Sequence, residues 1–374
     1  MSVLTKPQPG QAGPKIDRHA DAYQHCMVGI RKYWSSDLYK QVLKEIRADR
    51  TESEIEASTP EQLERDSQKY TTYQYFSWLE HQLQQYKYLG RYGVVTELSK
   101  QAPQLAELLD SAASRSPERL KLNPDIVPPT YYTRADFHQH PGGIWSDDYD
   151  AFAYELAAGI SGQVYPTQDS AGTSYRNLAK LCEERYHPKD VLDVGCGFGL
   201  SALPFKSETA ATRVVGCDLS APALKLSHMR ALEAELEIEF RQDSAEELAT
   251  FQDAEFDLVN SVALFHEIPQ KAARKFLRSA HRVLKPGGKF VVADLYRQPG
   301  GSLTHMFYLG SCSRNREPFM RSFIALDMVA ELEDAGFKDV EIEWFDSATA
   351  GAPVPTGINE GSHLNGWSLI TATK

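Results

Sequence analysis

The sequence predicts an α/β fold whose mainly parallel sheet follows an all-helical region. Residues 191–199, Val-Leu-Asp-Val-Gly-Cys-Gly-Phe-Gly, have the pattern of a buried strand that ends in a glycine-rich turn. Residues 214–218 form a second short apolar run, which closes on an acid. From residue 173 to the C-terminus strand and helix patterns alternate, whereas residues 18–115 show only the three- and four-residue spacing of helices.

The glycine turn after the first strand indicates a nucleotide-binding site. Glycine at 195, 197 and 199 removes side chains from the place where a ligand would meet the backbone. Asp218 ends the next strand nineteen residues after Gly199, where a ribose with two free hydroxyls needs an acceptor. A dinucleotide turn has the spacing G-x-G-x-x-G, and Leu200 occupies the position of its third glycine. The spacing therefore disfavours a nicotinamide-dependent oxidoreductase.

The G-x-G-x-G spacing in residues 191–199 resembles motif I of the class I S-adenosylmethionine-dependent methyltransferases. Three later blocks follow in the order of that family: residues 240–245 (FRQDSA), 256–261 (FDLVNS) and 283–292 (VLKPGGKFVV). The resemblance implies a seven-stranded Rossmann-like sheet with helices on both faces and its last strand antiparallel. Residues 340–345 and 366–372 would then form the closing hairpin.

The resemblance also implies S-adenosyl-L-methionine as the cofactor and indicates the residues that hold it. Asp218 matches the ribose-binding acid of the family. Asp243 matches the acid that flanks the adenine amino group together with the next backbone N–H. The predicted cofactor-binding residues are Asp193, Gly195, Gly197, Gly199, Asp218, Leu219, Asp243, Ser244, Ala245 and Asn260.

Composition limits the class of protein. The chain has 374 residues, of which 42% are hydrophobic and 24% charged, as in ordinary globular proteins. No apolar run approaches the roughly 20 residues of a membrane-spanning helix. Residues 1–15 lack the apolar core of a secretory signal, and the five cysteines show no C-x-x-C spacing. We therefore expect a cytoplasmic protein that does not bind membranes.

The charge distribution argues against a nucleic-acid substrate. Residues 1–130 carry 17 basic and 17 acidic side chains, so the net charge of −11 lies in the remainder, the predicted catalytic part. Nucleic-acid binding depends on a basic surface. The N-P-P-Y signature of amino-methylating nucleic-acid enzymes is also absent after the fourth strand, where the chain reads Asn-Ser-Val-Ala from residue 260. We therefore expect a small-molecule substrate.

The N-terminal helices form a separate region of the predicted organisation. Thr59 is expected to cap a helix with Pro60 at its first position, and the aromatic stripe from Tyr73 to Tyr86 to form a core or a dimer seam. In similar methyltransferases such helices cover the substrate or pair two subunits, and we expect a homodimer. The predicted regions are a disordered lead-in (1–15), a helical lid or dimerisation domain (16–125), a connecting, pocket-lining segment (126–172) and the catalytic domain (173–374).

The tip of the fourth strand is where this fold places groups beside the methyl end of the cofactor. Methyl transfer from a sulfonium is an in-line displacement, so the acceptor must be oriented and usually loses a proton. In the segment SVALFHEIP, we take His266 as the general base and Glu267 as its orienting partner or as a ligand of a substrate amine. The alternative is that this pair only shapes the loop.

Residues 131–145 combine aromatic side chains, two histidines and a glycine turn, which favours a pocket for a flat or cationic substrate. A structural turn is one alternative. A metal site from Asp136 and the two histidines is another, but no fourth ligand is evident and we predict no metal. Two arginines farther along would suit a substrate carboxylate, although a solvated surface run is the simpler interpretation. The candidate substrate residues are Tyr131, Tyr132, His138, His140, Trp145, Arg314 and Arg316.

These observations predict an S-adenosylmethionine-dependent methyltransferase acting on oxygen or nitrogen of a small molecule in specialised (natural product) metabolism. Two alternatives stay open. One is an enzyme of this fold that uses the charge of the sulfonium for a rearrangement or cyclisation without methyl transfer. The other is a non-catalytic binding protein on the same scaffold.

Overall fold

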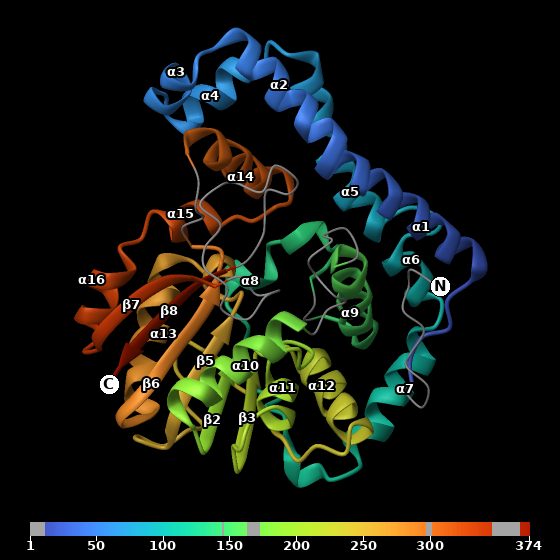
Figure 1. The fold of residues 1–374 in the computed structure, drawn as a ribbon. Coiled ribbons are helices and arrows are strands. Elements are labelled where there is room, and N and C mark those ends of the chain that lie inside the picture. Colours follow the sequence, from blue (N-terminus) through green and yellow to red (C-terminus); the bar gives the residue numbers. More distant parts are fainter. Residues whose placement is uncertain (1–11, 144–145, 163–172, 297–300, 346–366) are drawn as a thin grey trace.

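One eight-stranded sheet forms the centre of the protein (Figure 1). The computed structural model describes residues 12–143, 146–162, 173–296, 301–345 and 367–374. The strand order is β1-β4-β3-β2-β5-β6-β8-β7, and β8 runs antiparallel to both of its neighbours. This confirms the predicted fold and its closing hairpin. The strands are β1 (Leu120–Lys121), β2 (Asp190–Val194), β3 (Arg213–Asp218), β4 (Glu239–Gln242), β5 (Phe256–Val262), β6 (Leu284–Asp294), β7 (Lys338–Phe345) and β8 (Trp367–Thr373).

Strand β1 is an addition to the seven predicted strands. The sequence predicts an extended linker near residues 116–129, but Leu120 and Lys121 pair in parallel with Phe240 and Arg241 of β4. Without β1, β4 would be the edge of the sheet and would leave backbone groups unpaired. The local sequence does not indicate this pairing, because it depends on β4 being the strand at that edge of the sheet.

Helices cover both faces of the sheet, as predicted. Successive residues of β2 supply the two faces, because strand side chains alternate in direction. Val191 lies in the same buried cluster as Leu178 of α10, whereas Leu192 lies in the cluster that contains Phe276 of α13. The helices of the first face are α10 (Thr173–Tyr186), α11 (Ala202–Ser207) and α12 (Ala221–Glu233), and those of the second are α13 (Gln270–Val283) and α16 (Met328–Asp334).

The N-terminal region is helical, and a π-helical turn (Trp34–Leu38) joins its first two helices. Thr59 caps α4 as expected, because its side chain accepts from the Gln62 N–H and Pro60 occupies the first turn. Tyr73 and Phe76 of the predicted aromatic stripe are fully buried. The helices are α1 (Arg18–Tyr33), α2 (Tyr39–Asp49), α3 (Glu52–Ala57), α4 (Pro60–Ser67), α5 (Thr71–Tyr88), α6 (Val94–Ser99) and α7 (Ala102–Ala113).

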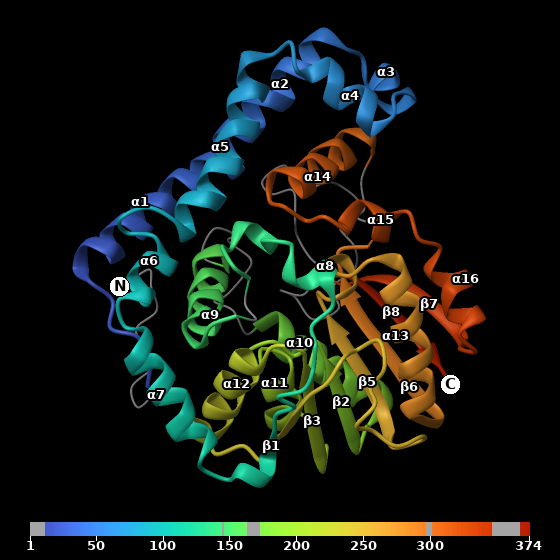
Figure 2. The same cartoon turned by 180° about the vertical axis from the view of Figure 1, so that it is seen from behind.

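These helices arch over the sheet domain and contact it at both ends of the arch (Figures 1 and 2). At one end α7 packs on α12, so Leu109 and Leu226 share a buried cluster. At the other end α3 and α4 pack on α14, and Phe76 contacts Phe307 edge to face. The buried clusters of the helical region thus include residues of the sheet domain. The elements between the arch and the sheet are α8 (Thr130–Thr133), α9 (Asp148–Gly162), α14 (Ser302–Arg314) and α15 (Met320–Ile324).

No helix in the described part of the chain is long and apolar enough to cross a membrane.

Candidate functional site

A cavity of about 160 Å³ lies at the carboxyl ends of β2, β3 and β5, where the strand order reverses. Open α/β sheets bind ligands at this switch point. Tyr131 and Tyr132 of α8 also line it. The predicted cofactor residues that line the cavity are Gly195, Gly197, Asp218, Leu219, Asp243, Ser244 and Ala245.

The turn after β2 requires glycine at two positions, because of both its backbone conformation and its close packing. Gly195 has φ +75°, and a Cβ there would stand 3.0 Å from the Leu264 side chain. Gly199 has φ +91°, and its Cβ would lie 2.6 Å from Leu203 Cδ1. Gly199 does not line the cavity, so its role is to let the turn enter α11.

The two predicted acids of the cavity are fixed by backbone N–H groups. Asp218 accepts from Gly197 N at 2.9 Å and from Ser220 N at 2.8 Å. Burial raises the pKa of Asp218, and these hydrogen bonds oppose the rise. Asp243 accepts from Ser244 N and from Thr250 N, each at 2.7 Å. Both carboxylates are therefore oriented before any ligand binds.

Asp193 and Asn260 lie beneath the turn and do not line the cavity. Asn260 Nδ2 donates to Asp193 Oδ1 at 2.6 Å, and Ser201 Oγ donates to Asp193 Oδ2 at 2.5 Å. Burial raises the pKa of Asp193 to about 6. These two predicted cofactor residues instead support the turn from below, because neither reaches the cavity.

A second cavity, of about 320 Å³, lies next to the first. Tyr154, Ala158, Tyr175 and Leu200 line both. The arch supplies part of its wall, including residues of α1 and α5, and α14 supplies another part. The aromatic residues of this wall are Trp34, Tyr88, Tyr154, Tyr175, Tyr308 and Trp367.

His266 and Glu267 lie in a 3-10 turn (Phe265–Glu267) beyond β5, and the contact between them is longer than the one between His266 and Asp294. His266 Nδ1 lies 2.5 Å from Asp294 Oδ1, whereas its Nε2 is 4.0 Å from Glu267 Oε1. The orienting partner is thus Asp294, at the end of β6. Burial lowers the pKa of His266, but Asp294 and then Glu317 and Glu267 outweigh it and raise the pKa to about 9.

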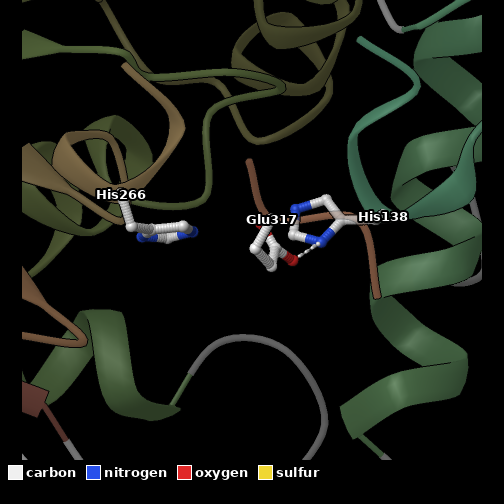
Figure 3. Close-up of side chains that lie close together, drawn as sticks. All are labelled: His138, His266 and Glu317. Atoms are coloured by element: carbon white, nitrogen blue, oxygen red, sulfur yellow. Dashed lines mark ion pairs between the residues drawn. The ribbon is translucent and has the colours of Figure 1, made fainter. Parts of the chain in front are cut away.

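His138 joins this cluster from the segment before α9. Its Nε2 lies 2.9 Å from Glu267 Oε1. Its Nδ1 lies 2.6 Å from Glu317 Oε1 (Figure 3). Burial lowers the pKa of His138, but the two carboxylates raise it to about 10. Its backbone is left-handed, with φ +54°, which turns the side chain between the carboxylates.

Ligand atoms of His138, His266 and Glu317 lie within 4.8 Å of one another, close enough for a metal ion. A histidine ligand must offer a nitrogen lone pair, whereas both nitrogens of His138 face carboxylates. The contacts are those of a charged imidazole in an ion-pair network. The trio proposed from sequence does not assemble, because Asp136 pairs with Arg316 and His140 with Asp150.

The other predicted substrate residues are scattered. Tyr131 and Tyr132 line the cofactor cavity. His140 is buried against Tyr88, with a ring-centre distance of 4.8 Å, and its Nε2 lies 3.1 Å from Asp150. Trp145 falls outside the described residues.

Arg314 and Arg316, which the sequence offered as candidates for a substrate carboxylate, do not line the second cavity. Arg314 forms an ion pair with Glu80 of α5, and Arg316 forms one with Asp136, 2.8 Å away, at the surface. Both guanidinium groups are occupied by the fold itself.

The sequence analysis missed Asp294, Glu317, Arg31 and Lys87. Asp294 offered a signal, since it is an acid at the carboxyl end of a predicted parallel strand. Glu317, Arg31 and Lys87 offered no such signal in the local sequence. They reach the site from α1, α5 and the loop after α14, and only the tertiary arrangement brings them together.

Comparisons with known proteins agree with this geometry. Residues 191–288 match the family described as "Methyltransferase domain". The ubiquinone biosynthesis O-methyltransferase of Alkalilimnicola ehrlichii is 37% identical over 109 residues, which are 29% of this chain and 42% of that protein. Its namesake from Pseudomonas syringae pv. tomato is 30% identical over 160 residues, 41% of this chain and 66% of that protein. The chain thus spans less than two thirds of these relatives.

Among solved structures, phosphoethanolamine N-methyltransferase 2 of Haemonchus contortus in complex with S-adenosyl-L-methionine is 20% identical. The match covers 67% of this chain and 60% of that chain, with a TM-score of 0.42.

The chain is a protein of the methyltransferase class with a site for a nucleoside cofactor, as the fold, the glycine turn and the family match together indicate. More narrowly, residues 191–288 match the methyltransferase domain, and the sheet around them is similar to that of the class I S-adenosylmethionine-dependent methyltransferases.

Proposed function

We propose that this protein transfers the methyl group of S-adenosyl-L-methionine to oxygen or nitrogen of a small molecule held in the second cavity. The observation that supports this most strongly is the pair of adjacent cavities, one lined by the glycine turn and the other by the arch. When bound, the cofactor supplies an electrophilic methyl group. The names of the curated relatives favour oxygen as the acceptor atom.

The residues of the first cavity fit this cofactor. The Asp218 carboxylate, held by two backbone N–H groups, would accept from both ribose hydroxyls. The glycine turn leaves room for the backbone to approach the ligand, and Asp243 with Ser244 would bind the adenine edge. Asp193 and Asn260 keep the turn in place.

The charged cluster would handle the proton of the acceptor. Glu267 lines the cofactor cavity, whereas His266 lines neither cavity. His266 would therefore act behind Glu267: in its deprotonated form, which becomes more populated as the pH approaches 9, its Nε2 would receive the substrate proton through that carboxylate. Asp294 holds the imidazole in orientation and stabilises its charged form.

The arch would serve as a lid, because α1 and α5 line the substrate cavity of their own chain. The aromatic wall of that cavity favours a flat substrate. Specialised metabolism and a cytoplasmic location stay proposals. A homodimer also stays a proposal. It is supported by Tyr75 and Trp78 of α5, which are 45% and 53% exposed and stack on each other.

The test is incubation with cofactor labelled in the methyl group and a panel of small phenols, carboxylic acids and amines. We expect label in one acceptor class and an equal amount of S-adenosylhomocysteine. Turnover without S-adenosylhomocysteine would establish the rearrangement alternative. Cofactor binding by calorimetry without any turnover across the panel would favour the binding protein, and failure to bind would refute the cofactor assignment.

A further inference from the structure

Two buried basic side chains line the second cavity, and no carboxylate in the described part of the chain lies within ion-pair distance of either. Lys87 of α5 is 3% exposed and Arg31 of α1 is 9% exposed. Within the described ranges neither side chain forms an ion pair with a carboxylate.

The contacts of these two side chains leave most of their N–H groups unused. Lys87 Nζ donates to Ser161 Oγ at 3.2 Å and lies 4.6 Å from the centre of the Tyr88 ring. Arg31 Nη1 donates to Gln84 Oε1 at 3.1 Å. An ammonium has three donors and a guanidinium five, so both have donors left for a ligand.

Other cations that the fold buries are treated differently. Arg230 is paired with Glu155 and Glu233, and Arg314 is paired with Glu80. A buried charge without a partner is costly, so a fold that needed Lys87 and Arg31 only for packing would gain from apolar side chains there. Burial and then Arg31 hold the pKa of Lys87 well below its usual value, with Glu317 opposing them. A carboxylate bound beside Lys87 would raise this pKa again and so favour the charged ammonium.

We propose that Lys87 and Arg31 form a subsite for a carboxylate of the substrate, an assignment that rests on the proposed function and narrows its substrate class. The guanidinium would bind the carboxylate through its planar fork and the ammonium would add a single charged donor. A monoanion suits the site better than a phosphate dianion. Glu317 lines the same cavity and its Oε2, which has no hydrogen-bond partner in the described structure, adds negative charge.

The test uses benzoate as a probe, because it combines a carboxylate with a flat ring that the aromatic wall accepts. Lys87→Met and Arg31→Met each remove one basic group and keep an unbranched side chain. Lys32→Met is the matched control, since Lys32 follows Arg31 on the same helix and is exposed. Benzoate affinity is measured by calorimetry, with benzamide as the neutral counterpart and inorganic phosphate as the dianion.

We expect benzoate to bind the wild type and Lys32→Met equally, and its Kd to rise by about tenfold or more in Lys87→Met and in Arg31→Met. Benzamide and phosphate should bind more weakly than benzoate. Equal benzoate affinity in all four proteins, no benzoate binding to the wild type, or tighter binding of phosphate would each overturn the carboxylate subsite.

A second measurement guards against a purely structural role. Without ligand, the Tm of Lys87→Met should equal or exceed that of the wild type, because the substitution replaces a buried amine that has no ion pair by an apolar side chain. A large fall in Tm would mean that Lys87 stabilises the fold and would contradict the proposal. Cofactor affinity, measured in the same samples, reports separately on the proposed function, since benzoate binding requires no methyl transfer.

Discussion

Replacing Asp294 by asparagine should remove the charge that keeps His266 protonated, and the effect on stability can be worked out from the structure. Asp294 is fully buried, and its carboxylate accepts from His266 Nδ1 and from the N–H of Phe265. Raising the pKa of His266 from 6.5 to about 9 corresponds to about 3 kcal/mol. In Asp294→Asn burial would dominate, and the pKa of His266 should fall toward or below its ordinary value.

Proton linkage determines how the stability difference between the wild type and Asp294→Asn changes with pH. The folded-state pKa of His266 lies above the unfolded value, so its stabilisation is complete below pH 6.5 and is lost as the pH rises through 9. At pH 6.5 the substitution should lower the free energy of unfolding by about 3–5 kcal/mol, since it breaks a buried ion pair. At pH 10 only the lost hydrogen bond remains, worth about 1–3 kcal/mol. The gap between wild type and variant should therefore narrow with rising pH.

The assay is urea unfolding of both proteins at several pH values from 6.5 to 10, with Asp253→Asn as the control. Asp253 undergoes the same chemical change but is 78% exposed and pairs with Arg282 at the surface. A gap between wild type and Asp294→Asn that stays constant across this range would refute the assignment of the raised pKa to Asp294. A pH-dependent gap of equal size in Asp253→Asn would show a general charge effect instead.

Three further outcomes are expected. Asp218→Ala should weaken S-adenosyl-L-methionine binding by about 1–3 kcal/mol through lost ribose hydrogen bonds; an unchanged Kd in calorimetry would disprove that role. Gly199→Ala should destabilise the fold by about 1–3 kcal/mol because of its φ of +91° and the contact with Leu203, and a wild-type Tm would contradict this. His266→Ala should lower turnover and remove the rise of activity toward pH 9 while leaving cofactor affinity nearly intact. If turnover and its pH profile are unchanged, His266 does not take the proton.

Short-range patterns were enough to predict the cofactor cavity. Gly195, Gly197, Asp218 and Asp243 each stand at or just after the carboxyl end of a strand that the local sequence identifies. In a parallel sheet these ends meet at one edge, so spacing along the chain translates directly into position. Asn260 was predicted to contact the cofactor but does not line the cavity, because its position near the end of a strand does not show whether its side chain reaches the cavity.

The charged cluster around His266 could be predicted only in part. His266 and Glu267 were identified, but Asp294 and His138 approach them from β6 and from the segment before α9. Arg314 was a candidate for binding a carboxylate or for a surface run, whereas the arch brings Glu80 to it as an ion-pair partner. Charged side chains pair with whatever the tertiary structure places beside them, and composition does not reveal that neighbour.

The sequence by itself determined the α/β sheet, its cofactor turn and the class of chemistry, because these depend on local strand, turn and glycine patterns. Tertiary structure alone decided the second cavity, the ion pairs around His138 and His266, and the burial of Lys87 and Arg31 with no ion pair to a carboxylate of the described residues. Residues of α1, α5 and α14 line that cavity together with Leu295, which follows β6. Contacts between segments so far apart in the chain depend on how the arch packs, which no local pattern encodes.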